Sequence, residues 1–282
     1  MSAVPTDTAD LGRKITGPTA LGTDVGRLWR LSWTLAVTQF RLKFYGSVLG
    51  YLWQLMRPLL LFGVLYVVFS VAIRVGDAAA YFPVVLLTGI VLYTFFNEAV
   101  SSSVSALVER EPLLRKVDFP RMAVPFAIVL TACMNLGLNL IVVLFFAALS
   151  GVPLHASLIQ APFLIALVAL LSLGIGLLVS SLFVRYRDVA PITDVFLQMT
   201  LYGSAIIFPL EAIPEEGQPW LMLNPFAAIV HQLRHAAIDP SVPSAFEVGG
   251  WRTFVGFALV FVVLAIGFAV FKRRAPYVAE DL

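Results

Sequence analysis

No Lys, Arg, Asp or Glu occurs between Arg121 and Arg185, where residues 122–184 read MAVPFAIVLTACMNLGLNLIVVLFFAALSGVPLHASLIQAPFLIALVALLSLGIGLLVSSLFV. A helix that crosses the hydrocarbon core of a bilayer needs about 20 apolar residues, so this stretch is far longer than one crossing requires. Near its middle, Ser150, Gly151 and Pro153 form a turn signal. The stretch therefore predicts two transmembrane helices, at about 124–149 and 159–184, joined by a very short loop.

The composition of the whole chain also indicates a membrane protein. Its 282 residues are 60% hydrophobic and 13% charged, whereas about 25% of the residues in soluble domains are charged. Further apolar stretches predict spans at about 52–73, 82–108, 195–208 and 253–271. The predicted fold class is an all-α integral membrane protein in which residues 46–282 form a bundle of six transmembrane helices.

The basic residues predict the orientation of these spans, because Lys and Arg concentrate in cytoplasmic loops. If the N-terminus is inside, only Arg74, Arg234 and Arg252 of the 19 Lys and Arg residues lie outside. Both termini are then cytoplasmic. Residues 1–23 mix Pro, Gly and charged residues and contain no apolar core of signal-peptide length, so we expect a flexible cytoplasmic tail there.

Residues 24–45 predict an amphipathic helix before the first span. Polar and basic side chains recur at steps of three and four residues, with apolar residues at the other positions; the polar set is Arg27, Arg30, Thr34, Thr38 and Arg41. Such a helix lies in the membrane interface with its basic side toward headgroups and cytoplasm. The alternative is a plain continuation of the first span, which the charge density disfavours.

Glu98 is the only carboxylate well inside a predicted span, and it lies toward the inner half of the membrane. Ionisable groups inside membranes are candidates for function, so Glu98 could contact a proton or a substrate. The alternative is a carboxylate that accepts hydrogen bonds from neighbouring helices, with Asn135, Asn139 or Gln198 as partners. We favour this second interpretation because no second carboxylate is available for a relay.

The segment after the short fifth span is apolar but broken by proline at positions 209, 214, 219 and 225, which suits backbone sheltered inside protein at membrane depth. Asn224 and Pro225 then predict the start of a helix. On that helix His231 and His235 are spaced i, i+4 and could share a metal ion, but no third ligand is evident. We therefore expect an amphipathic helix near the outer surface and no metal site.

Other functional classes find little support in the residues. The net charge of +2 is too small to indicate a nucleic-acid partner, and Cys133 is the only cysteine. No Gly-Lys dipeptide exists, so the chain contains no P-loop of the Walker type. If ATP drives transport, another subunit must bind it. We expect no enzyme activity and no cofactor in this chain.

The loop after the second span reads EREPLLRKVDFP over residues 109–120. Acidic residues lead and basic residues follow, which is the charge order that a short helix prefers. Leu113, Leu114 and Val117 would form an apolar patch facing the cytoplasm, where a soluble partner could dock. Periodicity alone does not distinguish this from a patch that lies on the membrane surface.

Four segments carry a resemblance to a known family. They are FRLKFYGSVLGYLW (residues 40–53, running on to Pro58), LLRKVDFPR (113–121), RYRDV (185–189) and LNPF (223–226). In order and spacing they resemble the permease subunits of polysaccharide ABC exporters, the type-two class that moves O-antigen, teichoic-acid or galactan chains on lipid carriers. The resemblance covers the chain from about residue 24 onward.

This resemblance implies a homodimer of the chain in a bacterial plasma membrane, with two ABC ATPase subunits docked beneath it. These partners would bind ATP and Mg²⁺. The loop would be the coupling helix, formed by Glu111, Leu113, Leu114, Arg115, Lys116 and Val117, and the broken segment between the fifth and sixth spans would be a re-entrant external gate. The transported molecule would be a lipid-linked polysaccharide.

A conduit for polysaccharide is expected to present aromatic rings, whose flat apolar faces pack on sugars. The family resemblance places such rings on the first and fifth spans, where the candidates are Phe62, Tyr66, Phe69, Phe196 and Tyr202. For each of them, ordinary packing or lipid contact is about as good an interpretation.

Two other functions stay open at the level of sequence. One is a small-molecule or drug efflux permease of the same class. The other is a membrane-embedded glycosyltransferase, which would normally carry clustered acidic residues for a metal and a nucleotide sugar. Asp188 and Asp194 are too isolated to support the enzyme. A secondary transporter is disfavoured because neither an inverted repeat nor a pair of intramembrane charges is evident.

Overall fold

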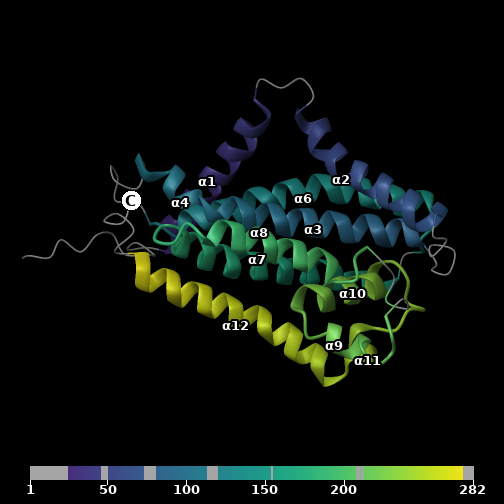
Figure 1. Cartoon of the computed structure of the whole chain (residues 1–282). Helices are drawn as coiled ribbons and strands as arrows, with labels where there is room; N and C mark the ends of the chain where they lie inside the picture. Colours follow the sequence, from purple (N-terminus) through teal and green to yellow (C-terminus); the bar gives the residue numbers. More distant parts are fainter. Residues whose placement is uncertain are drawn as a thin grey trace, which may run out of the picture.

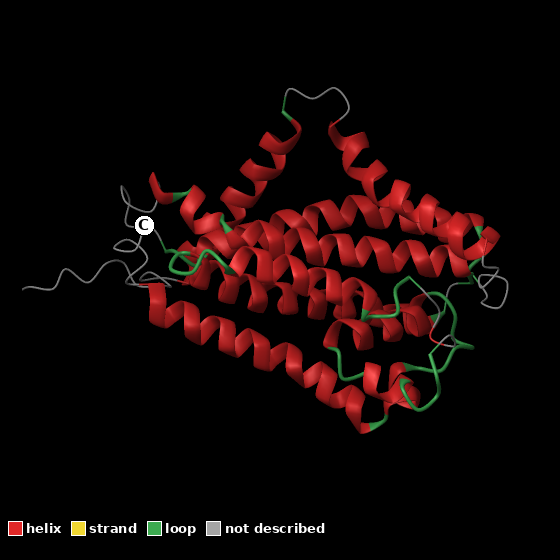
Figure 2. Cartoon of the chain, in the orientation of Figure 1, coloured by secondary structure: helices red, strands yellow, loops and turns green. Residues whose placement is uncertain are grey.

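The computed structural model describes residues 25–45, 50–72, 81–112, 120–153, 155–207, 210 and 213–275, and the regular structure in these ranges is entirely helical (Figures 1 and 2). The predicted tail, residues 1–23, lies outside the described residues. Long helices run side by side along one axis of the molecule, and short helices gather at one end of the bundle (Figure 1). An all-α membrane bundle is therefore confirmed as the fold class.

Five segments among the described residues are long and apolar enough to cross a membrane. They correspond to α2 (Gly50–Tyr66) with its π-helical continuation η2 (Val67–Ala72), α3 (Phe82–Val104), α6 (Ala123–Leu149), η4 (Ala156–Gln160) with α7 (Ala161–Phe183), and α12 (Trp251–Arg274). These five fall on the predicted ranges 52–73, 82–108, 124–149, 159–184 and 253–271. The second is shorter than predicted, because the helix breaks at Ser105, before the single turn α4 (Ala106–Glu109).

The predicted fifth span, 195–208, corresponds to a helix with different limits. Helix α8 (Val189–Tyr202) begins just after Asp188, carries the exposed Asp194, and ends six residues earlier than predicted. Its 14 residues give a length of about 21 Å, which is shorter than the ~30 Å hydrocarbon core. Six complete crossings therefore remain a prediction.

Helices α3 and α7 occupy the centre of the bundle. Helix α3 packs against α2, α6, α7 and α8, while α7 also packs closely against α12. Small residues make these approaches possible: a Cβ on Gly176 would lie 2.8 Å from Oγ of Ser103, and one on Gly174 would lie 2.7 Å from Cα of Leu264. Gly176 thus lets α7 approach α3 closely, and Gly174 lets it approach α12.

Helix α1 (Val25–Phe44) lies against α6 along one narrow face. Leu28, Ser32 and Ala36, four residues apart, are buried, and the Thr131 hydroxyl of α6 donates a hydrogen bond to the Ala36 carbonyl (3.3 Å). A flanking face exposes Trp29 and Trp33, whose rings stack 6.4 Å apart. In Figure 1, α1 slopes away from the bundle and α2 returns toward it.

The short helices α9 (Gln218–Leu221), α10 (Pro225–Ala237) and α11 (Ala245–Gly249) lie together at the end of the bundle where α12 begins (Figure 1). Asn224 starts α10, as predicted: its side-chain oxygen accepts from the backbone N–H of Phe226 at 3.0 Å. The same side chain donates to the Gly203 carbonyl at the end of α8 (3.1 Å). One residue thus joins the ends of two helices that are 22 positions apart in the chain, from Tyr202 to Asn224.

Candidate functional site

A polar cluster surrounds Glu98 inside the bundle. Its carboxylate accepts hydrogen bonds from the Lys43 ammonium (2.6 Å), the Asn135 amide (2.6 Å) and the Gln54 amide (3.5 Å). These partners come from α1, α6 and α2, so four helices meet at one carboxylate. The Glu98 side chain keeps only 20% of its surface exposed, against 39% for Lys43. The favoured interpretation of Glu98 as a hydrogen-bonded group agrees with this geometry.

The partners of Glu98 differ in part from those predicted. Asn135 is one of them, whereas the Asn139 amide donates to the Asn135 carbonyl instead (2.9 Å) and Gln198 is exposed on α8. Sequence reasoning missed Lys43 and Gln54. No pattern in the sequence identifies either residue as a partner of Glu98, because the contact depends on how α1 leaves the bundle and α2 returns.

A cavity of about 530 Å³ opens beside this cluster. Besides Glu98, Lys43 and Gln54, it is lined by the polar residues Arg57, Thr94, Asn97, Ser101 and Ser102 and by Pro58, Leu61 and Tyr93. Its volume falls in the range of ligand-binding pockets. A polar cavity between helices that are otherwise apolar is the part of the molecule best suited to hold a charged or hydroxylated ligand.

The predicted conduit residues of the first span face the bundle. Phe62 is 9% exposed, stacks on Tyr66 (ring centroids 5.6 Å apart) and meets Phe146 of α6 edge-on (5.9 Å). Phe69, in η2, is half-buried and packs on the same core. In this arrangement the three rings contribute to packing, and contact with a substrate remains a prediction for them.

The other two conduit candidates lie on α8 and are more open. Phe196 is 43% and Tyr202 is 63% exposed. Phe196 also lines an apolar pocket of about 390 Å³ between α3, α7, α8, α10 and α12, together with Phe96 and Met199. Helix α3 packs on both α2 and α8, so the two sets of rings lie on two different neighbours of that helix.

The two histidines of α10 are held by the segment that follows the helix. Ring nitrogens of His231 and His235 lie 3.0 and 2.7 Å from the carbonyls of Pro243 and Val242. Since a carbonyl only accepts, each of these nitrogens is the protonated one. Within the described ranges, no three His, Cys, Asp or Glu side chains group as metal ligands.

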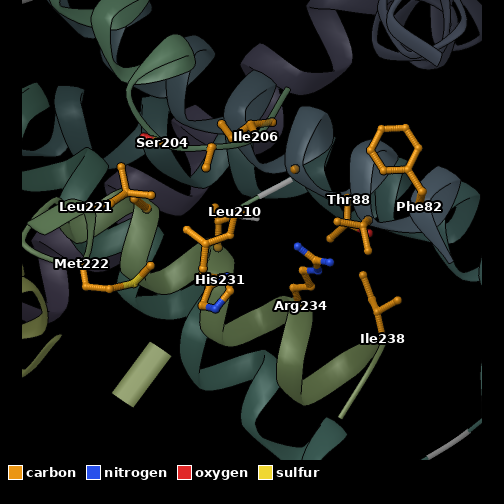
Figure 3. Close-up of a pocket in the computed structure, with 15 residues that line it drawn as sticks. Phe82, Thr88, Ser204, Ile206, Leu210, Leu221, Met222, His231, Arg234 and Ile238 are labelled. Atoms are coloured by element: carbon orange, nitrogen blue, oxygen red, sulfur yellow. The ribbon is translucent and has the colours of Figure 1, made fainter. Parts of the chain in front are cut away.

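His231 and Arg234 point from α10 into a small pocket that also contains Thr88 of α3, Ile206 and Met222 (Figure 3). Both side chains are 7% exposed. The space is about 30 Å³, which is enough for about one water molecule. This space is too small for a sugar or a lipid chain, and its walls join α10 to α3.

Of the predicted coupling residues, the structure describes only Glu111, which is half-buried just after α4. Leu113, Leu114, Arg115, Lys116 and Val117 lie outside the described residues. Burial lowers the pKa of the neighbouring Arg110, and Glu109 acts in the opposite direction. The α4 turn lies at the end of the bundle where α12 finishes and opposite α9, α10 and α11 (Figure 1).

This bundle of apolar helices is that of a membrane-spanning protein, and the sequence assigns its family. Residues 30–238 match the ABC-2 type transporter family, and the chain belongs to it. The resemblance to permeases of this class is thereby confirmed, and the protein is a multi-pass integral membrane protein.

Among curated proteins, the chain is similar to O-antigen export system permease proteins RfbA. It is 25% identical over 252 residues to the one from Myxococcus xanthus, covering 88% of this chain and 94% of that protein. It is 23% identical over 260 residues to one from Klebsiella pneumoniae, covering 92% and 97%. The polysialic acid transport protein KpsM of Escherichia coli is 23% identical over 244 residues, covering 85% and 92%.

Proposed function

We propose that this chain is the permease subunit of an ATP-driven ABC exporter that moves a lipid-linked polysaccharide across a bacterial inner membrane. The observation that carries the proposal is the nearly full-length similarity to permeases whose names specify O-antigen export and polysialic acid transport. These names favour neither drug efflux nor a glycosyltransferase. Family membership implies a separate ABC ATPase, which would bind ATP and Mg²⁺.

In this proposal the chain works as a homodimer with both termini in the cytoplasm. Helix α8 serves as the fifth of six spans, and the broken segment from Pro209 to Asp239 is re-entrant and forms an external gate. Helix α1 lies at the cytoplasmic interface and braces the ATPase contact. The abundance of short helices between α8 and α12, tied to α8 through Asn224, supports a broken rather than a continuous crossing.

The ATPase would dock on the loop that contains Glu111, Leu113, Leu114, Arg115, Lys116 and Val117. Binding and hydrolysis of ATP by the ATPase would shift the permease dimer between two conformations. The shift occurs because the ATPase with ATP bound has a different affinity for each conformation. The position of Glu111 at the α4 end of the bundle is compatible with a partner that approaches from that end.

Affinity purification of the tagged chain from its native membrane tests the partnership. We expect a P-loop ATPase in roughly equal amount, and its loss when Leu113, Leu114 and Val117 are replaced by Asp. The control is Ile159→Asp, at an exposed position in η4, just before α7 begins; this variant should retain the ATPase. Recovery of the chain without any ATPase, even after crosslinking, would refute the proposal.

Replacement of aromatic residues tests the substrate. Phe196→Ala and Tyr202→Ala alter exposed rings on α8, so they should reduce glycan export without releasing the ATPase. Surface glycan in a strain that depends on this chain is the measurement. Unchanged glycan together with lost drug resistance would favour the efflux permease instead.

A further inference from the structure

Helix α3 carries a polar stripe along one side of an otherwise apolar span. Thr94, Asn97, Glu98 and Ser101 follow each other at steps of three, one and three residues, which places them on one helical face. All four line the cavity of about 530 Å³ between α1, α2 and α3. Polar groups inside a membrane cost free energy unless they are paired. Glu98 and Thr94 have protein partners, so the members of the stripe that need partners are Asn97 and Ser101.

The charges that line this cavity identify the class of ligand. Lys43 and Arg57 are cationic, whereas Glu98 is the one carboxylate on its wall. Lys43 is already paired with Glu98 at 2.6 Å. Arg57 is exposed, and the described residues offer it no hydrogen bond or ion pair. The cavity therefore has one positive charge in excess, which favours an anion.

Hydrogen-bond donors extend the same wall. The side chains of Asn97, Ser101 and Ser102 have no hydrogen-bond partner among the described residues, unlike Thr94, which donates to the Ile90 carbonyl. Guanidinium groups match phosphate oxygens with paired N–H donors, and hydroxyl and amide groups supply further donors. This set of donors is suited to a phosphate group.

The depth of the cavity indicates where such a phosphate comes from. Glu98 lies six residues before the end of α3 at Val104, a distance of about 9 Å along the helix. A helix of 23 residues is about 34 Å long and just exceeds the hydrocarbon core. Along α3 the cavity extends from Thr94, about 15 Å from that end, to Ser102, about 3 Å from it. Its Ser101 and Ser102 edge thus reaches the boundary between hydrocarbon and headgroups, from where a lipid phosphate can enter.

We propose that this cavity is a phosphate-binding site that accepts the headgroup of a membrane lipid. Arg57 binds the phosphate, Ser101, Ser102 and Asn97 donate to it, and Lys43 is shared between the phosphate and Glu98. Glu98 holds Lys43 in place when the site is empty and competes with the phosphate for it. Binding of a lipid phosphate does not depend on the proposed function. The additional inference that this lipid is the transported one does rest on it.

Binding is measured directly by native mass spectrometry of the purified full-length chain, titrated with phosphatidic acid or with diacylglycerol of the same acyl chains. We expect saturable binding of phosphatidic acid and none of diacylglycerol. Arg57→Gln should weaken phosphatidic acid binding by about tenfold or more, the effect of losing charge-assisted hydrogen bonds. Arg273→Gln, which changes an exposed arginine at the end of α12, is the matched control and should bind normally.

Glu98→Gln separates a built site from general attraction to anionic lipid. It removes the competitor for Lys43, so phosphatidic acid should bind several-fold more tightly. The substitution also removes one negative charge from the chain, and this change in net charge needs its own control. Asp188→Asn, at an exposed position on the α7–α8 turn, removes the same charge and should leave binding unchanged. Equal tightening by both variants would overturn the proposal, as would equal binding by Arg57→Gln and the unaltered chain.

Inorganic phosphate distinguishes the two sources of the group. Displacement of phosphatidic acid by millimolar phosphate supports the site, whereas binding of inorganic phosphate with no binding of phosphatidic acid would overturn the lipid source. None of these measurements needs an ATPase. Intact lipid binding in a chain that recovers no ATPase would therefore refute the proposed function alone.

Discussion

At the scale of single residues, Glu98 illustrates how a carboxylate is accommodated within a transmembrane bundle. A buried charge is costly unless it is paired and hydrogen-bonded. Glu98 meets this condition through one ammonium group and two amides, each from a different helix. Removing a single partner should therefore cost more than removing the pair.

Lys43→Met should lower the stability of the chain by about 1–3 kcal/mol, because it leaves the Glu98 carboxylate without its cation. The double variant Lys43→Met with Glu98→Gln should recover most of this loss, since no unpaired charge remains. Thermal unfolding in mild detergent measures both. A double variant that is no more stable than Lys43→Met would show that the ion pair is not the cause.

The residues of this cluster also show how far sequence reasoning extends. Asn135 could be predicted as a partner of Glu98, because both are polar residues in apolar helices and need each other. Lys43 could not, since its place on an exposed, basic helix is explained by the membrane surface alone. Only the path of α1 and α2 brings it to α3.

At the scale of helices, the crossing of α7 and α12 depends on glycine. A Cβ on Gly267 would collide with the backbone of Gly174. In contrast, a Cβ on Gly137 of α6 would have nothing within 4 Å. The two positions thus differ in packing while both lie inside apolar helices.

Gly267→Ala should destabilise the chain by about 1–3 kcal/mol, because α12 must shift away from α7. Gly137→Ala should be neutral or raise stability by up to about 1 kcal/mol through helix propensity. Unfolding of both variants under identical detergent conditions gives the comparison. Equal effects of the two substitutions would contradict a glycine-dependent crossing.

Asn224 connects α8 and α10 through two different hydrogen-bonding roles. Asn224→Asp keeps the oxygen that caps α10 but loses the amide that donates to Gly203. Asn224→Ala loses both, so it should cost about 0.5–2 kcal/mol for the cap and a further loss for the carbonyl. Stability in the order Asn, Asp, Ala is expected, and hydrogen exchange at residues 200–205 should rise in both variants. An Asp variant as stable as the Asn chain would show that the link to α8 contributes nothing.

The limits of helices were predictable where apolar residues and turn signals coincide. The uncharged stretch 122–184 yielded α6 and α7 because the residues near 150 cannot continue a helix. The sequence does not reveal the limits of α8, because Asp188 lies at its start and Asp194 on its exposed side, and hydropathy alone excludes both from a span. A short helix with polar residues carries too weak a pattern to fix its ends.

At the scale of the whole molecule, the two ends of the bundle are built differently. One end carries α4, the turn between α7 and α8, and the basic end of α12. The other carries α9, α10 and α11. This asymmetry agrees with the orientation that the basic residues predict, with the first end in the cytoplasm.

Single cysteines test this orientation in a Cys133→Ser background. Ser150→Cys lies at the end of α6 and should react with a membrane-impermeant thiol reagent added to intact cells. Asp188→Cys should react only after the membrane is opened; its side chain makes no capping hydrogen bond, so the substitution is mild. The reverse pattern of labelling would invert the predicted topology.

The arrangement of helices around α3 could not be predicted from the sequence. Hydropathy identifies which segments enter the membrane, but lipid-facing and protein-facing sides are equally apolar, so the pattern does not reveal the neighbours of a helix. The cavity beside Glu98 arises only when α1 and α2 diverge. Its residues are separated by up to 59 positions in the chain, from Lys43 to Ser102.

The ion pair of Lys43 and Glu98 also bears on how the protein is made. Residues enter the membrane in the order of synthesis, so Lys43 and Gln54 are in place before Glu98 emerges from the ribosome, whereas Asn135 arrives later. Glu98 can therefore pair with Lys43 as soon as α3 enters the membrane, and α3 can be inserted before α6 is made. Lys43→Met should therefore delay membrane integration of α3 in a cell-free translation with membrane vesicles, and unchanged integration would show that the pair forms only after the bundle is complete.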